Sequence, residues 1–287
     1  MEEENIKAKK TCPVKNPFAR LAICLVAGIL IGWGATTFMN SRSNRPLGTA
    51  TVAEAELDKT CASFTKDGKS TDVTIRQVLT TSGNLETSKD SEGNYNVPAA
   101  DMIMGYVRNK VMLDIAAKKN ITVSDDEALD FLKKNMGAQS YDDLAKNAQV
   151  DVETVKGLVR ESATIQKLYD DVAGLSDGAT EPAQPTQPAE GKKDEATTEY
   201  FDYIVGLAKD EWDANAGTWA RQDGPYYQAL SSEDFSDGKA TYAQAQTAYY
   251  IAVQDFSAKQ AKSGQAWADF VRSELSNVSI TINTLAS

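Results

Sequence analysis

Residues 101–135 read DMIMGYVRNKVMLDIAAKKNITVSDDEALDFLKKN, and two helix signals follow each other in this stretch. In its first half, apolar side chains recur at the spacing that puts them on one side of a helix ending near Asn120. These side chains are Met102, Ile103, Tyr106, Val107, Leu113 and Ala117. In the second half, Ser124 and Glu127 form a capping box, and Gly137 suits the end of the short helix that follows. The stretch therefore predicts a mainly α-helical fold.

The chain on the C-terminal side continues this pattern. Ser140 and Asp151 are predicted to begin a short helix and a long helix. Residues 175–199 have no apolar period and contain Pro182, Pro185 and Pro188, which is typical of an extended linker. A helix is expected from about 200 to 212, an irregular aromatic segment over 217–239, and a long helix over about 241–275.

Strand signals occur on both sides of this helical region. Two short β-prone runs, residues 61–65 and 70–73, flank an Asp67-Gly68 pair, which favours a type I′ hairpin turn. Thr74 and Gln77 then have capping-box spacing, which predicts a helix directly after the hairpin. At the other end, Val278–Ile282 alternates apolar and polar residues as a half-buried strand does.

The N-terminal region contains the only long uncharged run, LAICLVAGILIGWGATTFMNS at residues 21–41. Its apolar part, 21–39, would rise about 28 Å as a helix, close to the thickness of one hydrocarbon core. Five Lys or Arg residues precede the run and only two follow closely, which predicts a cytoplasmic N-terminus and an exterior main domain. A cleaved signal peptide is the alternative. Gly28 and Gly32 have the spacing that lets two membrane helices approach closely, which would favour a homodimer. The alternative is that this glycine spacing arises by chance.

Composition excludes several classes of function. Residues 46–287 carry 23 Lys or Arg and 38 Asp or Glu, a net charge of −15, which disfavours nucleic-acid binding. The chain has no histidine, so neither a Ser-His-Asp triad nor a His-ligated zinc site is possible. The predicted exterior part has one cysteine, Cys61, expected to be a half-buried strand residue. We expect no catalytic residue, no metal and no cofactor.

The order of these elements resembles the peptide-binding lobe of the SurA-type and PrsA-type extracytoplasmic foldases, which the chaperone region of trigger factor shares. The resemblance covers about residues 60–173 and 241–283, and its best local match is AAKKNITVSDDE at 116–127. It implies a helical chaperone lobe in which a last strand returns to the first, so residues 61–65 should pair with 278–282. Most such foldases carry a parvulin prolyl isomerase domain between the two halves; residues 175–239 have no parvulin signature, so isomerase activity is not expected.

The resulting organisation has seven parts. They are a cytoplasmic tail (1–20), an anchor (21–39), a stalk (40–58), the first part of the lobe (59–174), the linker (175–199), a helix with the aromatic segment (200–240), and the closing helix and strand (241–287).

Three functions are weighed. The first is a membrane-anchored holdase for unfolded segments of secreted proteins, which needs an adaptable apolar surface; methionine and aromatic side chains suit such a surface, although each can equally be core. The candidate contacts are Met102, Met104, Met112, Met136, Trp219, Tyr226 and Tyr227. The second is an adaptor or scaffold in a secretion or cell-envelope complex. The third is an enzyme using the acids at 125–127 or 142–143, which helix-start electrostatics explain more simply.

Overall fold

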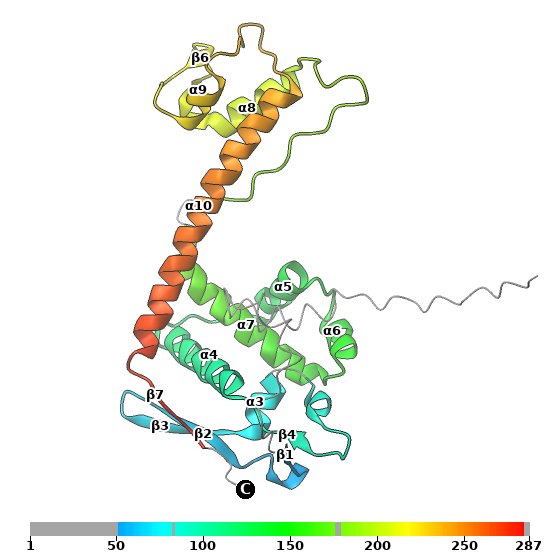
Figure 1. The fold of residues 1–287 in the computed structure, drawn as a ribbon, viewed down its shortest axis with the longest axis vertical. Coiled ribbons are helices and arrows are strands. Elements are labelled where there is room, and N and C mark those ends of the chain that lie inside the picture. Colours follow the sequence, from blue (N-terminus) through cyan, green and yellow to red (C-terminus); the bar gives the residue numbers. More distant parts are fainter. Residues whose placement is uncertain (1–50, 82–83, 176–178, 284–287) are drawn as a thin grey trace, which may run out of the picture. The chain divides into compact units, whose positions relative to one another are not determined.

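The computed structural model describes residues 51–81, 84–175 and 179–283. In this part of the chain the protein is mainly helical with small antiparallel sheets, as the sequence predicts (Figure 1). The chain divides into two compact units. Unit 1 takes in the described residues up to Val172 and those from Ala268 onward, and unit 2 spans Ala173–Trp267. The predicted anchor, with Gly28 and Gly32, lies outside the described residues.

Unit 1 contains the predicted hairpin. β2 (Thr60–Lys66) and β3 (Lys69–Thr74) pair antiparallel with Lys66 opposite Lys69. Asp67 and Gly68 have φ values of 52° and 75°, and two successive positive φ values are what a type I′ turn requires. Cys61 is fully buried in β2 rather than half-buried as expected.

The C-terminal strand closes this sheet. β7 (Ser279–Ile282) pairs antiparallel with β2, placing Ile280 opposite Phe64 and Ile282 opposite Ala62. The backbone N–H of Asn283 donates to the carbonyl of Cys61 at 2.8 Å, which extends the ladder by one bond. The predicted pairing of residues more than 200 positions apart is therefore confirmed.

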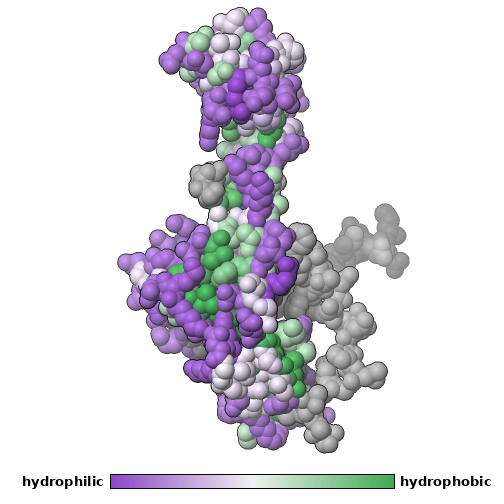
Figure 2. Space-filling model, turned by 90° about the vertical axis from the view of Figure 1, so that its left-hand side faces the viewer, coloured by the Kyte–Doolittle hydropathy of each residue, from purple (hydrophilic) through white to green (hydrophobic). Residues whose placement is uncertain are grey.

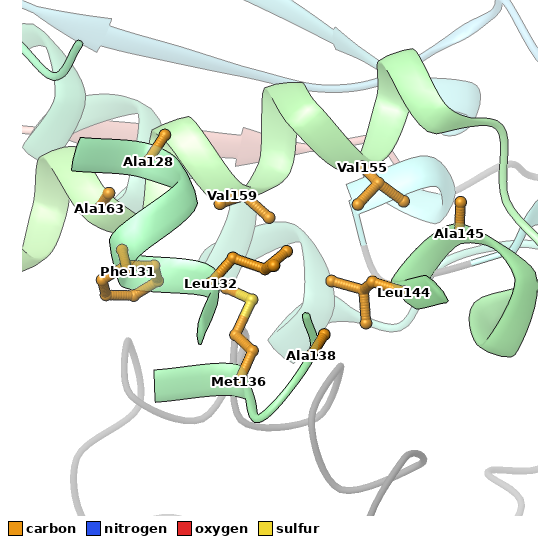
Figure 3. Packing of buried hydrophobic residues seen from close by; sticks show 10 residues of the cluster. All are labelled: Ala128, Phe131, Leu132, Met136, Ala138, Leu144, Ala145, Val155, Val159 and Ala163. Carbon is orange, nitrogen blue, oxygen red and sulfur yellow. The ribbon is translucent and has the colours of Figure 1, made fainter. Parts of the chain in front are cut away.

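Five helices of unit 1 lie between these strands in sequence. They are α3 (Ile75–Thr81), α4 (Ala100–Lys118), α5 (Asp125–Met136), α6 (Tyr141–Ala148) and α7 (Val152–Ala173), of which α7 ends at the boundary with unit 2. The caps before α3, α5, α6 and α7 are those that the sequence predicts, and Gly137 ends α5 with a φ of 65°. One core cluster joins α5, α6 and α7 (Figure 3). Its members are Ala128, Phe131, Leu132, Met136, Ala138, Leu144, Ala145, Val155, Val159 and Ala163.

The last part of the predicted stalk is folded instead. β1 (Thr51–Val52) pairs with β4 (Tyr95–Asn96), and a 3-10 turn, η2 (Glu54–Glu56), follows β1. Val52, Leu57 and Tyr95 are buried. Residues 84–96 likewise contain β4 and a second 3-10 turn, η3 (Leu85–Ser88). Because these buried apolar residues stand singly among polar ones, no periodic pattern marks them in the sequence.

The cap of α5 contains a carboxylate contact that we expect to weaken in acid. The Glu127 carboxylate accepts hydrogen bonds from Lys167 Nζ at 2.7 Å and from the Ser124 backbone N–H at 2.8 Å, and these lower its pKa from 4.5 to about 2. Because this pKa is lower in the folded state, the stabilisation is complete above pH 4.5 and is lost as the pH falls towards 2. When the pH is lowered from 4.5 to 2, the melting temperature of Glu127→Gln should therefore fall less than that of the parent chain. Far-UV circular dichroism measures both melting temperatures.

The matched control is Asp126→Asn. Asp126 is the exposed neighbouring carboxylate and has no hydrogen bond or ion pair to another described residue. This variant should keep the acid profile of the parent. Identical profiles for Glu127→Gln and the parent would contradict the assignment.

Unit 2 is built on α8 (Thr198–Ala208) and the first part of α10 (Tyr242–Leu275). A 3-10 turn, η4 (Lys209–Glu211), leads to a two-stranded hairpin of β5 (Trp212–Asp213) and β6 (Thr218–Trp219), and α9 (Pro225–Leu230) follows. The core combines Tyr200 and Ile204 of α8 with Ala245 and Ala248 of α10. Residues 241–267 belong to unit 2, whereas the sequence predicts that they close the lobe together with 268–287.

Candidate peptide-binding surface

The second turn of α4 carries the most exposed methionine among the described residues. Ile103, Val107 and Val111 are buried in this helix. Met104 is 56% exposed, and Met102 is half-buried. An exposed, unbranched and polarizable thioether can adapt to varied apolar side chains. Of the four predicted methionines, Met104 has the placement that a binding contact needs.

Arg108 lies one helical turn after Met104 and was not singled out in the sequence. Its guanidinium is partly buried, and the loss of solvent lowers its pKa from the ordinary value of 12.5. It makes no hydrogen bond or ion pair to another described residue. A guanidinium carries five N–H donors, which suit the carbonyl groups of an extended peptide. The i, i+4 spacing from Met104 is the sequence signal that could have identified it.

The other two methionines pack inside unit 1. Met112 is 2% exposed and Met136 is 7% exposed. Figure 3 shows the Met136 side chain among the core residues of α5, with Leu132 beside it. Both side chains fill core volume, which is the alternative role of a methionine on a helix. In the described conformation they are not available to a ligand.

Apolar residues also reach the surface of unit 1 more broadly. On the face drawn in Figure 2, hydrophobic residues form a patch bordered by hydrophilic ones. Contiguous apolar surface of this kind is typical of interaction sites, since single scattered apolar residues are the norm elsewhere.

The predicted aromatic residues lie in unit 2, where they form a cluster. Trp219 contacts Trp212 at 5.2 Å and Tyr227 at 5.7 Å between ring centroids, both edge to face. Phe235 packs on Trp212 at 6.2 Å, also edge to face. Trp212 and Phe235 were not among the predicted contacts, because Trp212 was expected to end a helix. The β5–β6 hairpin instead turns it towards Trp219.

Tyr226 sits beside this cluster at the start of α9. Burial, followed by the nearby charges of Asp255 and Glu211, raises its pKa to about 12. The phenol is therefore neutral throughout the physiological range and can act as a hydrogen-bond donor. All three predicted aromatic residues are half-buried, so each combines packing with some accessible ring surface.

A buried carboxylate fixes α9 and its tyrosines. Glu211 is 2% exposed, and its Oε2 accepts a hydrogen bond from the Tyr227 backbone N–H at 2.9 Å. Arg221 lies 3.7 Å from the other carboxylate oxygen. Gly224 caps the helix, and a Cβ at that position would lie 2.0 Å from Glu211 Cδ. The Gly224-Pro225 pair was visible in the sequence, but nothing linked it to Glu211.

The described residues offer surfaces for binding. They contain no group of three or more His, Cys, Asp or Glu that could hold a metal ion. Cys61 is buried and its thiol donates to the Val73 carbonyl at 3.4 Å. Burial raises the pKa of this thiol, which keeps it protonated and poorly nucleophilic.

Known proteins give no further guidance. No family model, curated protein or solved structure matches this chain. Within the described residues, no helix combines the length and apolar character needed to span a bilayer.

Proposed function

We propose that the protein is a membrane-anchored, extracytoplasmic chaperone-like holdase that binds unfolded segments of secreted proteins, without prolyl isomerase activity. The observation that carries this proposal is the β2–β7 pairing, because a last strand returning to the first is what the resemblance to SurA-type and PrsA-type lobes implies. The caps of α3, α5, α6 and α7 agree with the same order of elements.

The proposed contact surface is the part of α4 around Met104 and Arg108. Met104 supplies an adaptable apolar group, and Arg108 supplies donors for peptide carbonyls. The two residues are one turn apart on α4, whose buried residues fix the helix in unit 1, so the contact face is held on a rigid element. The negative charge of residues 46–287 favours clients with basic segments and keeps the holdase soluble.

Isomerase activity is not part of the proposal. The segment between the two halves of the lobe contains no histidine, and its only described sheet is the β5–β6 hairpin. Crossing a barrier of about 20 kcal/mol requires a preorganised site. The sequence of this segment contains no parvulin signature.

The test is aggregation of two unrelated denatured proteins in the presence of the purified full-length chain, together with a prolyl isomerase assay on a tetrapeptide. We expect suppression of aggregation for both clients at stoichiometric amounts and an isomerisation rate equal to the uncatalysed one. Absence of suppression for both clients would refute the holdase function and favour an adaptor that serves one dedicated partner.

A further inference from the structure

The proline-rich segment of unit 2 has a burial pattern with a period of three. Residues 181–190 read EPAQPTQPAE, and they form neither helix nor strand up to residue 189. Pro185 is buried, and Pro182 and Pro188 are half-buried. Every other residue of the ten is exposed. The prolines alone therefore face the rest of the unit.

A burial period of three is the period of a polyproline II helix. This helix has three residues per turn, so residues three apart lie on the same edge. Proline fixes φ near the polyproline II value, which lowers the entropy lost on docking. The polyproline II helix has no internal hydrogen bonds, so its carbonyl groups remain free to accept from a partner.

Two tyrosine hydroxyls of α8 use those carbonyl groups. Tyr203 donates to the carbonyl of Ala183 at 2.6 Å, and Tyr200 donates to the carbonyl of Thr186 at 2.8 Å. The acceptors are three residues apart on the segment, and the donors are three residues apart on one side of α8. Aromatic side chains with donors aimed at the carbonyls of a proline-rich strand are the arrangement by which polyproline II ligands are recognised.

The residues that connect the segment to α8 lie on the surface of the unit. Residues 189–196 are all exposed. The burial of the segment falls on the three prolines, and two side-chain hydrogen bonds join its carbonyl groups to α8. The core cluster of unit 2, which includes Ile204 and Ala245, contains no residue of the segment. The docking is therefore of the kind that a competing ligand can displace.

We propose that the Tyr200–Tyr203 side of α8 is a binding surface for proline-rich segments of other polypeptides that carry proline at every third position, and that residues 182–188 occupy it as an internal pseudo-ligand. The partner chemistry follows from the segment that the surface already holds. Residues 173–267 carry 15 Asp or Glu and 7 Lys or Arg, a net charge of −8, which favours partners with basic residues beside the prolines. This inference goes beyond the holdase function and does not depend on it.

The test uses the full-length chain and a labelled peptide of sequence EPAQPTQPAE. A released variant replaces Pro182, Pro185 and Pro188 with glycine, which keeps the chain length while removing the rings that dock. If the segment occupies the surface at least nine-tenths of the time, the released variant should bind the peptide about tenfold more tightly than the parent or better. Fluorescence anisotropy measures this difference.

Two controls make the result specific. In the released variant, Tyr203→Phe keeps the ring but removes one donor and should weaken binding roughly threefold to tenfold. A peptide of the same composition with its three prolines adjacent should bind no variant measurably. Equal binding of the two peptides would overturn the proposal.

A second measurement guards against misfolding of the released variant. Titration of the parent chain with millimolar peptide should shift the nuclear magnetic resonance signals of residues 182–188, because the peptide then displaces a tethered segment whose effective concentration is on the order of millimolar. Unshifted signals of this segment together with no binding by a folded released variant would overturn the proposal. Two copies could also exchange the segment and form a dimer. A dimer of this kind that the peptide cannot dissociate would overturn the proposal as well.

Discussion

Deletion of residues 277–287 should destabilise unit 1 by about 3 kcal/mol or more and lower its melting temperature by about 10 °C. The deletion removes β7 and with it the ladder to β2 over residues 62–65. It also exposes the side of β2 on which Phe64 is opposite Ile280. Lys66 and Glu274 form an ion pair at 3.0 Å, and the Lys66 side chain is largely buried. The deletion removes the strand that follows Glu274 in the chain.

The control for this deletion is a chain that ends at Asn283. It retains β7 and the hydrogen bond from Asn283 to Cys61, and its stability should stay within about 0.5 kcal/mol of the parent. Hydrogen exchange of the β2 amides reports on unit 1 directly. Unchanged β2 protection after removal of 277–287 would show that the terminal strand does not hold the lobe together.

Gly224→Ala should destabilise unit 2 by about 2–4 kcal/mol. The new methyl group would lie 2.0 Å from Cδ of a buried carboxylate, so Glu211 would have to move. Movement breaks its hydrogen bond to the Tyr227 backbone N–H and leaves the start of α9 without that acceptor. The tryptophans in the described part of the chain, Trp212, Trp219 and Trp267, all belong to unit 2, so denaturant unfolding followed by tryptophan fluorescence measures the loss.

Gly206→Ala is the matched control. Gly206 is an exposed helical residue of α8, and a Cβ there would meet nothing within 4 Å. The substitution should leave unit 2 unchanged or stabilise it by up to about 1 kcal/mol. Glu211→Ala should relieve the clash, so the double variant with Gly224→Ala should be more stable than the sum of the single effects predicts. A Gly224→Ala chain as stable as the parent would contradict the role of Glu211.

Much of the fold follows from local patterns in the sequence. The Asp67-Gly68 turn and the caps at Ser124, Ser140 and Asp151 need only residues within four positions of one another, so their chemistry is visible without the fold. The β7 pairing was accessible by another route, since alternation marked the strand and the family resemblance supplied its partner. Those are the parts of the fold that were predicted correctly.

The remaining features depend on contacts distant in sequence. Leu57 and Tyr95 are single apolar residues in polar surroundings, and only the paired β1 and β4 strands explain their burial. Glu211 reads as an ordinary surface acid until Gly224 allows it to approach α9. Composition identified the segment around Pro185 as extended, but its contacts with α8 could not be deduced.

The burial of the candidate peptide-binding residues likewise depends on contacts that are distant in sequence. Periodicity places a methionine on a helix, but it does not say which residues of the helix the rest of the fold covers. The sequence therefore did not distinguish the burial of Met104 from that of Met112. The structure separates them, with one exposed and the other buried. Arg108 was missed because a charged residue on a helix is ordinarily a solvated one.

The most direct test of the proposed holdase is the aggregation assay repeated with Met104→Glu beside Ala117→Glu. Both residues are exposed on α4, so the two variants share the added charge and the helix and differ in the surface that they alter. Burying the exposed part of one methionine is worth about 1 kcal/mol. We therefore predict that Met104→Glu needs roughly fivefold more protein for the same suppression, while Ala117→Glu matches the parent. Equal suppression by Met104→Glu and the parent would contradict the account.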